Sequence, residues 1–151
     1  MKYVEEQFGW IMNGSLLLVT FLILLLFLFK IGDNPLGVFS LLFAVGIILL
    51  VFLMFFKLKI TIEEKYIVVS FGIGIVKSKF LIEDIATIKR VKNPWYLGWG
   101  IHYFNNGILY NIQGFEAVEL SFKSKKKLVR IGVSSRSKIL QEIERRIIKK
   151  S

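Results

Sequence analysis

Two long apolar runs occupy most of the first third of the chain. Residues 15–29 (SLLLVTFLILLLFLF) and residues 36–56 (LGVFSLLFAVGIILLVFLMFF) contain no charged side chain. A bilayer core of about 30 Å requires about 20 helical residues, because a helix rises about 1.5 Å per residue. The second run has this length, and the first reaches it when it is extended back to Trp10. We therefore expect two membrane-spanning helices, at about residues 10–29 and 36–56.

Neither a pair of buried core helices nor a signal peptide fits these runs as well. A soluble domain of 151 residues has too little remaining mass to enclose two uncharged helices. A cleaved signal peptide would begin with a basic segment and end at small residues. Here Glu5 and Glu6 precede the first run, and no small-residue site follows it. The runs thus indicate an integral membrane protein.

The segment KIGDNPLG between the runs predicts a tight connection, because Asn34-Pro35 cannot continue a helix. The two helices then form a hairpin with both ends on one side. The formal net charge is +10, to which residues 1–56 contribute −1 and residues 57–151 contribute +11. By the positive-inside rule, we expect a multi-pass protein of the cell membrane with both termini in the cytoplasm. Residues 1–56 form its N-terminal segment and hairpin, and residues 57–151 its cytoplasmic domain.

After residue 56 the pattern changes to short, alternating runs rich in β-branched residues, which predicts strands joined by tight turns. We expect strands at about residues 58–63, 66–71, 73–79, 85–92, 99–105, 107–113, 116–122 and 127–132. Strands of this length and spacing predict an antiparallel sandwich or barrel.

The end of the chain, SSRSKILQEIERRIIKK, has a helical period. Glu142 is placed to pair with Arg146 one turn later. Its apolar residues share one face of the predicted helix: Ile139, Leu140, Ile143 and Ile147. The fold class that follows is an α+β membrane protein, with a β-rich domain capped by one amphipathic helix.

The stretch WYLGWGIHYFNNGILYNIQG, residues 95–114, holds two of the three tryptophans, four glycines and the only histidine. A two-residue type I′ turn at Asn106-Gly107 would place His102 opposite Asn111. On the other face it would pair Tyr103 with Tyr110, Ile101 with Ile112, and Trp99 with Gly114. An aromatic ring over a cross-strand glycine stabilises a sheet. We therefore interpret the stretch as scaffold, with a ligand site as the alternative.

Three motifs carry a resemblance to a known family. I-x-D-I-x-x-I at residues 82–88 precedes P-W-Y-L-G-W-G-I at residues 94–101, and L-Y-N-I-x-G-x-E-A-V-E-L follows at residues 109–120. With two apolar runs ahead of them, they resemble the bacterial pleckstrin-homology-like (PH-like) membrane proteins. The family commonly has Arg at the position of His102 and Ser at that of Gln113. The signature residues of the resemblance are Trp99, Gly100, Tyr110, Asn111 and Gly114.

The resemblance implies a PH-like fold, with about seven antiparallel strands in two orthogonal sheets closed at one end by a C-terminal helix. Domains of this fold mostly bind proteins or lipids. The resemblance therefore implies binding and no particular reaction.

The sequence offers little for catalysis. The absence of cysteine and the single histidine exclude disulfides, thiol catalysis and the usual zinc sites. The acidic pairs at residues 63–64 and 83–84 lie close to lysines, as in solvated turns. Gly72 and Gly74 lack the third glycine and the following helix of a phosphate-binding loop. We expect no enzyme, no cofactor and no metal.

Basic residues cluster at several places after residue 56, including Lys77 with Lys79, residues 89–92 and residues 145–150. Near an anionic leaflet, each lysine or arginine contributes about 1 kcal/mol of attraction. The alternative is a solvated face that keeps the domain soluble. Nucleic acid is not expected, because few aromatic residues are interleaved with the basic run at residues 123–127. The candidate contacts to an anionic lipid or a partner are Lys123, Lys125, Lys126, Lys127 and Arg130.

These observations predict a binding or scaffolding module anchored in the bilayer. Our leading expectation is a protein-interaction or assembly role at the inner membrane surface. A protein partner or a second copy would then occupy a groove between the C-terminal helix and a sheet edge. The alternative is recognition of anionic lipid headgroups by the basic surface.

Overall fold

The computed structural model of the chain describes residues 2–123 and 127–148. Over these residues the protein is α+β, with three α-helices and two β-sheets of four and five strands. In chain order the elements are β1 (Tyr3–Phe8), α1 (Trp10–Leu28), α2 (Val38–Phe55), β2 (Lys57–Ile62), β3 (Tyr66–Phe71), β4 (Val76–Leu81), β5 (Ile85–Lys92), the 3₁₀ helix η1 (Trp95–Leu97), β6 (Gly100–Phe104), β7 (Gly107–Asn111), β8 (Glu116–Phe122), β9 (Leu128–Gly132) and α3 (Ile139–Ile148).

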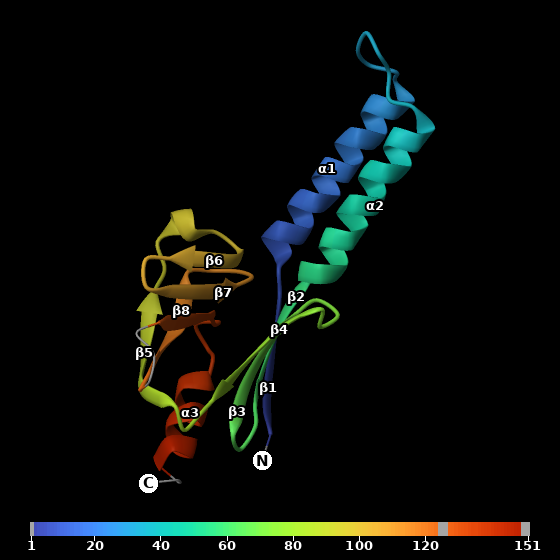
Figure 1. The fold of residues 1–151 in the computed structure, drawn as a ribbon. Coiled ribbons are helices and arrows are strands. Elements are labelled where there is room, and N and C mark those ends of the chain that lie inside the picture. The colour runs from blue at the N-terminus through green and yellow to red at the C-terminus, as the bar shows by residue number, and fades with distance from the viewer. Residues whose placement is uncertain (1, 124–126, 149–151) are drawn as a thin grey trace.

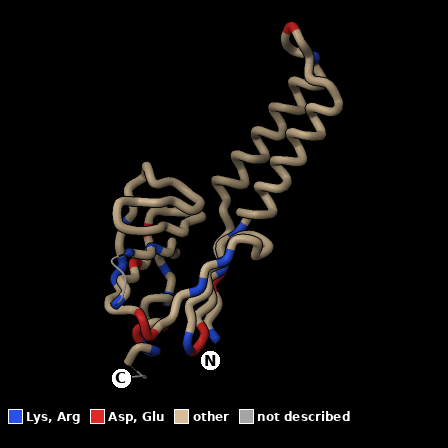
Figure 2. Tube along the Cα trace, in the orientation of Figure 1, with Lys and Arg blue, Asp and Glu red and all other residues tan. Residues whose placement is uncertain are grey.

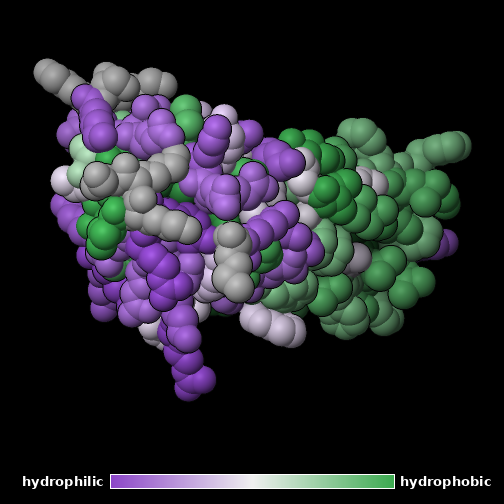
Figure 3. Space-filling model, turned by 90° about the horizontal axis from the view of Figure 1, so that it is seen from below, coloured by the Kyte–Doolittle hydropathy of each residue, from purple (hydrophilic) through white to green (hydrophobic). Residues whose placement is uncertain are grey.

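The helices α1 and α2 form a hairpin that projects away from the sheets (Figure 1). Both helices are long and apolar enough to cross a membrane, by length and composition. Asn13 is the buried residue of α1, and no residue of α2 is buried. Charged residues along the hairpin occur only at its distal turn (Figure 2). Seen from below, apolar residues cover the hairpin and polar residues predominate on the β-rich part (Figure 3). The expected apolar helices are therefore present, within two residues of the expected bounds.

The hairpin is inserted between two neighbouring strands of one sheet. The strand β1, which the sequence pattern did not predict, pairs antiparallel with β2 from Tyr3 opposite Ile62 to Phe8 opposite Lys57. At the junction, the Gly9 amide and the Asn13 side-chain amide both donate to the Phe56 carbonyl, at 3.1 and 3.0 Å. If the chain is divided after residue 56, β1 therefore belongs to the first part, whereas the other strands of its sheet belong to the second part.

The first sheet has the order β1-β2-β3-β4 and is antiparallel throughout. The second sheet has the order β5-β8-β9-β7-β6. The eight strands expected after residue 56 are all present. Only β4 is clearly displaced, because Gly72 and Gly74, with φ of +54° and +95°, place a turn at the predicted start of this strand.

One strand pair contradicts the expectation of a wholly antiparallel fold. The strands β7 and β9 run parallel, with Gly107 opposite Leu128 and Tyr110 opposite Ile131. The reason is the position of β9 in the sheet, because it lies between β8 and β7 and pairs with both. Because β9 reverses the direction of β8, and β8 that of β7, β9 has the same direction as β7.

The hydrophobic core lies between the two sheets and is closed by α3. Ile60 and Ile131 are among the fully buried residues that the sheets contribute. From α3, Ile139 and Ile143 are fully buried, while Leu140 and Ile147 pack at the edge. The amphipathic character of this helix is confirmed. The predicted pair is confirmed as well, because the Arg146 guanidinium donates to the Glu142 carboxylate at 2.6 Å.

The β6–β7 hairpin differs from its predicted register by two residues. Its turn consists of Asn105 and Asn106, because Phe104 pairs with Gly107. Neither asparagine has a positive φ, so the turn is not the expected type I′, which requires positive φ at both central positions. Ile101 consequently lies opposite Tyr110.

The expected cross-strand pairs in this hairpin are therefore wrong. His102 faces Leu109 instead of Asn111, and Trp99 lies outside β6 instead of facing Gly114. A two-residue shift keeps each side chain on its expected side of the sheet, because side chains alternate with a period of two.

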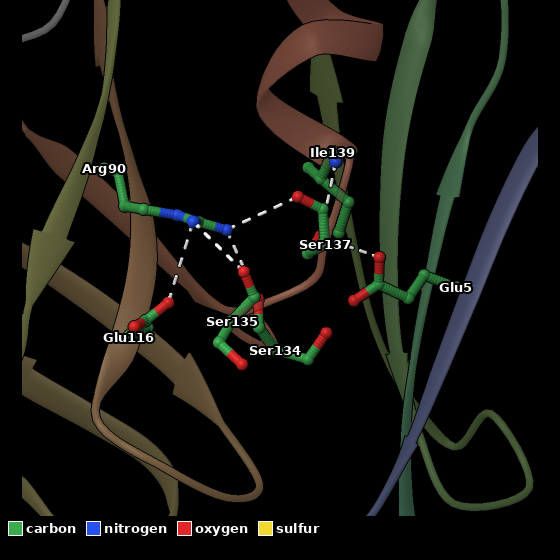
Figure 4. Close-up of polar contacts among 7 residues, drawn as sticks. All are labelled: Glu5, Arg90, Glu116, Ser134, Ser135, Ser137 and Ile139. Carbon is green, nitrogen blue, oxygen red and sulfur yellow. Dashed lines mark hydrogen bonds and ion pairs between the residues drawn. The ribbon is translucent and has the colours of Figure 1, made fainter.

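The segment between β9 and α3 is held from both sheets (Figure 4). From β5, Arg90 donates to the carbonyl oxygens of Ser134 and Ser135 at 3.3 Å and to that of Ser137 at 3.4 Å. From β1, the Glu5 carboxylate accepts the Ser137 hydroxyl at 2.7 Å. The Ser137 Oγ in turn accepts the first amide of α3 at 3.3 Å. Helix α3 therefore begins where the two sheets meet.

Candidate anion-binding site at the base of the hairpin

The first sheet has one apolar face and one basic face. Side chains alternate along each strand, so that Leu58, Ile60 and Ile62 of β2 enter the core. The intervening residues of β2, Lys57 and Lys59, point to the opposite face. On β4 the same alternation exposes Lys77 and Lys79. The four lysines therefore lie on one face of the sheet.

Strand register brings the lysines of β2 and β4 across from each other. Lys59 lies opposite Ser70, and Ser70 lies opposite Lys77. In the neighbouring row, Thr61 lies opposite Val68, which lies opposite Lys79. In both rows the β3 residue, Ser70 or Val68, has a short side chain. The longer lysine side chains on the strands beside β3 therefore form the walls of a shallow hollow.

The hollow has a volume of about 680 Å³. Its lining includes five lysines and one carboxylate, which leaves a formal charge of +4 among the lining residues. Thr61 and Ser70 lie between the cations, and the Ser70 hydroxyl donates to the Lys59 carbonyl at 3.5 Å. The lining residues are Lys2, Phe56, Lys57, Lys59, Thr61, Glu63, Val68, Ser70, Gly72, Ile73, Gly74, Lys77 and Lys79.

Three of the five lysines are partly compensated, and one of them, Lys2, lies 3.9 Å from the Glu63 carboxylate. Glu6 of β1 forms ion pairs with Lys57 and Lys59, both at 3.1 Å. Hydrogen bonds from Lys59 and Lys57 lower the pKa of Glu6 below its ordinary value. Lys79 lies over the Tyr66 ring at 3.6 Å, and Lys77 forms no ion pair within the described part of the chain. The β4 lysines are therefore the ones whose charge is available to an incoming anion.

The hollow runs along the sheet from the base of the hairpin, at Phe56 and Gly72, to the opposite end of the strands, at Lys2 and Glu63. The turn after β3 contacts the last turn of α2, where the Ile73 amide donates to the Leu53 carbonyl at 3.1 Å. Gly72 is required there, because a Cβ atom at this position would lie 2.0 Å from the Leu53 oxygen. Ile73 and Ile75 are 62% and 58% exposed. Figure 1 shows this turn beside the end of α2.

Of the lysine cluster that the sequence suggested, the structure describes Lys123 and Lys127. Lys125 and Lys126 fall outside the described residues. Lys123 is exposed, and its amide donates to the Asp84 carbonyl ahead of β5 at 2.8 Å. In Figure 1 the start of β5 is the end of this strand farther from the hairpin. Lys127 is also exposed, and the structure does not bring these lysines to the base of the hairpin.

Arg130, the last candidate contact, is engaged within the second sheet. Its Nε donates to Glu119 at 2.7 Å, and its guanidinium lies 4.5 Å from the Phe104 ring centroid. The guanidinium also donates to the Asn93 side chain at 3.4 Å. The Arg130 side chain is therefore held by partners within its own chain.

The signature residues form a support for the loop around η1. The Asn111 side-chain amide donates to the carbonyl oxygens of Gly98 and Gly114, both at 3.1 Å. The His102 Nε2 lies 2.8 Å from the Trp99 carbonyl. Gly98, Gly100 and Gly114 have φ of +58°, +113° and +67°, a region that favours glycine. Tyr110 is buried, and its hydroxyl is 2.8 Å from the Ser78 hydroxyl.

No protein-family profile matches this chain, and no curated protein is significantly similar to it.

Sequence reasoning identified the basic pair Lys77 and Lys79 but did not join it to Lys57 and Lys59. The available signal was the lysine spacing of two on both segments, which places each pair on one face of a strand. What the sequence lacks is the pairing of β2, β3 and β4 that brings the two lysine pairs together. The hollow is therefore a feature of the tertiary structure.

Proposed function

We propose that the protein is a membrane-anchored, PH-like binding module without catalytic activity, and that its basic hollow binds the phosphate of an anionic lipid headgroup. The observation that carries this proposal is a hollow lined by five lysines, one end of which lies at the base of two apolar helices. A phosphate at this place meets the ammonium groups of the lysines, which form charge-assisted hydrogen bonds with its oxygens. The PH-like fold is proposed for the two sheets and the closing helix, since the parallel β7–β9 pair departs from that pattern.

The pairing of β1 with β2 supports the membrane topology in this proposal. Because these strands are hydrogen-bonded neighbours, the two ends of the hairpin lie on one side of any bilayer that it spans. The charge of +11 in residues 57–151 favours the cytoplasm for that side by the positive-inside rule. The end of the hollow beside the hairpin would then lie next to the headgroup region of the inner leaflet.

Lipid recognition takes precedence here over the protein-interaction hypothesis. That hypothesis requires an apolar groove between α3 and a sheet edge. Helix α3 instead buries Ile139 and Ile143 completely in the core of its own chain. The exposed apolar residues nearest the hollow, Ile73 and Ile75, lie at the base of the hairpin. This position favours the bilayer as the binding partner.

The proposal is tested with the full chain in detergent micelles, titrated with short-chain phosphatidylglycerol and, separately, with short-chain phosphatidylcholine. We expect binding of phosphatidylglycerol that weakens with salt, because the Debye length falls from about 10 Å at 0.1 M to about 3 Å at 1 M. In the variant Lys77→Gln/Lys79→Gln, affinity should fall about 30-fold, because each lysine contributes about 1 kcal/mol.

The matched control is Lys123→Gln/Lys127→Gln, which removes the same charge from an exposed site away from the hairpin. This variant should bind like the unmodified chain. Equal losses in both double variants would show that only net charge matters and would refute the hollow as a site. Inorganic phosphate distinguishes the source of the anion, because binding as tight as that of the lipid would point to a free phosphate ligand.

A further inference from the structure

Two large aromatic side chains stand exposed at the tip of the loop between β5 and β6. Trp95 and Tyr96, in the 3₁₀ helix η1, are 79% and 70% exposed. Their rings contact each other edge to face, with centroids 6.3 Å apart. Trp95 also borders a shallow hollow with Pro94 and Phe115. Apolar surface of this kind is unfavourable in water, and contiguous patches usually mark an interaction site.

The loop that carries these aromatic residues is held firmly by the residues around it. On one side, the Asn93 amide donates to the Phe115 carbonyl at 2.6 Å. On the other side, Asn111 binds the Gly98 carbonyl, and His102 lies within hydrogen-bond distance of the Trp99 carbonyl. Holding a loop in its bound conformation reduces the ordering cost of binding. The unusual residues that follow Tyr96 thus form a rigid base for an exposed aromatic tip.

The aromatic tip is turned toward the hairpin end of the molecule. Figure 1 shows that the yellow segment between β5 and β6 extends farther toward the hairpin end of the molecule than the strands of the second sheet. The turn between β3 and β4 lies on the other side of this base. Trp10, at the first position of α1, is 73% exposed at the base itself.

We propose that Trp95 and Tyr96 insert into the interfacial layer of the bilayer that the hairpin spans, as a second membrane contact of the β-rich part. Trp and Tyr favour this layer, because their rings are apolar while their N–H and O–H groups still reach water or headgroups. The contact would fix the tilt of the sheets against the membrane and so hold the basic hollow at headgroup level. The inference rests on the proposed membrane span and does not depend on which anion the hollow binds.

Fluorescence quenching in proteoliposomes tests this contact. The chain has no cysteine, so a single-cysteine variant Tyr96→Cys can carry one environment-sensitive fluorophore in the full-length protein. We expect several-fold stronger quenching by lipids with a spin label near the headgroup than by aqueous iodide. In the background Trp95→Ser this preference should be lost, while Tyr103→Ser, which removes an aromatic of 78% exposure from β6, should leave it unchanged.

Two further labelled positions separate the inference from the proposed function. A label at Leu17→Cys in α1 reports on the membrane span, and a label at Lys65→Cys, in the turn between β2 and β3, should respond only to iodide. Failure of lipid quenching at position 17 would refute the span. Quenching at position 17 without quenching at position 96 would refute the aromatic contact alone. If neither the spin-labelled lipids nor iodide quenched the label at position 96, the tip would be covered by another protein or a second copy. This outcome would also overturn the proposal.

Discussion

Arg130 of β9 donates its Nε hydrogen to the Glu119 carboxylate of β8 over 2.7 Å, and the two residues are direct partners in the strand register. Glu119 is only 4% exposed. Its second oxygen is bound by Lys89 at 3.0 Å. Burial alone would raise the pKa of Glu119, but the hydrogen bonds from Arg130 and Lys89 outweigh it and lower the pKa below the ordinary value. This buried carboxylate is thus a structural anion.

Removing the partner of this carboxylate should be costly. We expect Arg130→Met to lower the free energy of unfolding by about 3 kcal/mol, because it leaves a buried charge with only the exposed Lys89 beside it. Urea unfolding of the detergent-solubilised full chain, followed by tryptophan fluorescence, measures the change. The control Arg136→Met removes an exposed arginine and should change stability by less than about 0.5 kcal/mol. Equal effects of the two variants would contradict the structural role.

The same carboxylate should make stability sensitive to acid. Because the pKa of Glu119 is lower in the folded state, its contribution is complete above the unfolded value of about 4.3 and is lost as the pH falls through the folded value. The unfolding temperature should therefore fall below about pH 4.3. In Glu119→Gln this acid dependence should be shallower than in the unmodified chain. An unchanged slope would assign the acid sensitivity to other groups.

Asn111 should be the polar side chain on which the η1 loop depends. Asn111→Ala removes the donor to the Gly98 and Gly114 carbonyls, so that stability should fall by about 1–3 kcal/mol. Asn106→Ala, in the exposed turn of the same hairpin, is the matched control and should be nearly neutral. Amide hydrogen exchange at residues 95–99 should rise only in the first variant. Equal exchange in both variants would show that the loop is held by other contacts.

Ser137 should couple β1 to α3. Ser137→Ala removes both the hydroxyl bound to Glu5 and the acceptor for the first amide of α3, and a lost helix cap costs about 1 kcal/mol. Ser135→Ala is a close control, because Arg90 binds the carbonyl of this residue and not its side chain. Thermal unfolding should distinguish the two variants. A Ser135→Ala effect as large as that of Ser137→Ala would contradict this assignment.

The strand pairing allows the hairpin to be replaced by a turn. Since Phe8 and Lys57 are paired neighbours, residues 1–8 joined through Asn-Gly to residues 57–151 should fold as a soluble domain with an ordinary two-residue β-turn. Residues 57–151 alone lack β1, which leaves the edge of β2 unpaired and prone to aggregation. Size-exclusion chromatography and thermal unfolding should show a monomer with the higher melting temperature only for the joined chain. Identical behaviour of both chains would mean that β1 contributes little.

Much of the fold could be predicted from the sequence, because hydrophobic periodicity reports directly on local structure. The apolar helices, the eight strands after residue 56 and the face of α3 all follow from it. Strand β1 could not be predicted in this way, because its inward positions carry Glu5 and Gln7, whose polar groups bind Ser137 and the Gly132 carbonyl. By its pattern alone, such a segment resembles a polar tail.

The remaining differences arise from contacts that are distant in the sequence. The register of β6 against β7 depends on how the turn at Asn105 and Asn106 is closed, and an Asn-Gly pair alone did not specify it. The parallel pairing of β9 with β7 depends on which side of β8 the chain returns. The basic hollow requires β2 and β4 to flank β3. For the candidate site, the sequence therefore supplied the lysines but not their arrangement.

The insertion of the hairpin between β1 and β2 also sets an order of events during synthesis. The six residues of β1 are made first, but their partner strand is made only after both apolar helices. If the hairpin spans a membrane as proposed, β1 remains unpaired while the hairpin inserts. If the chain inserted with only one span, β1 and β2 would be left on opposite sides of the bilayer. The first sheet would then lack its edge strand, and α3 would lose the Glu5 contact at its start. With the proposed membrane span, completion of the β-rich part would depend on correct insertion of the hairpin, and a wrongly inserted chain would remain incompletely folded and open to proteolysis.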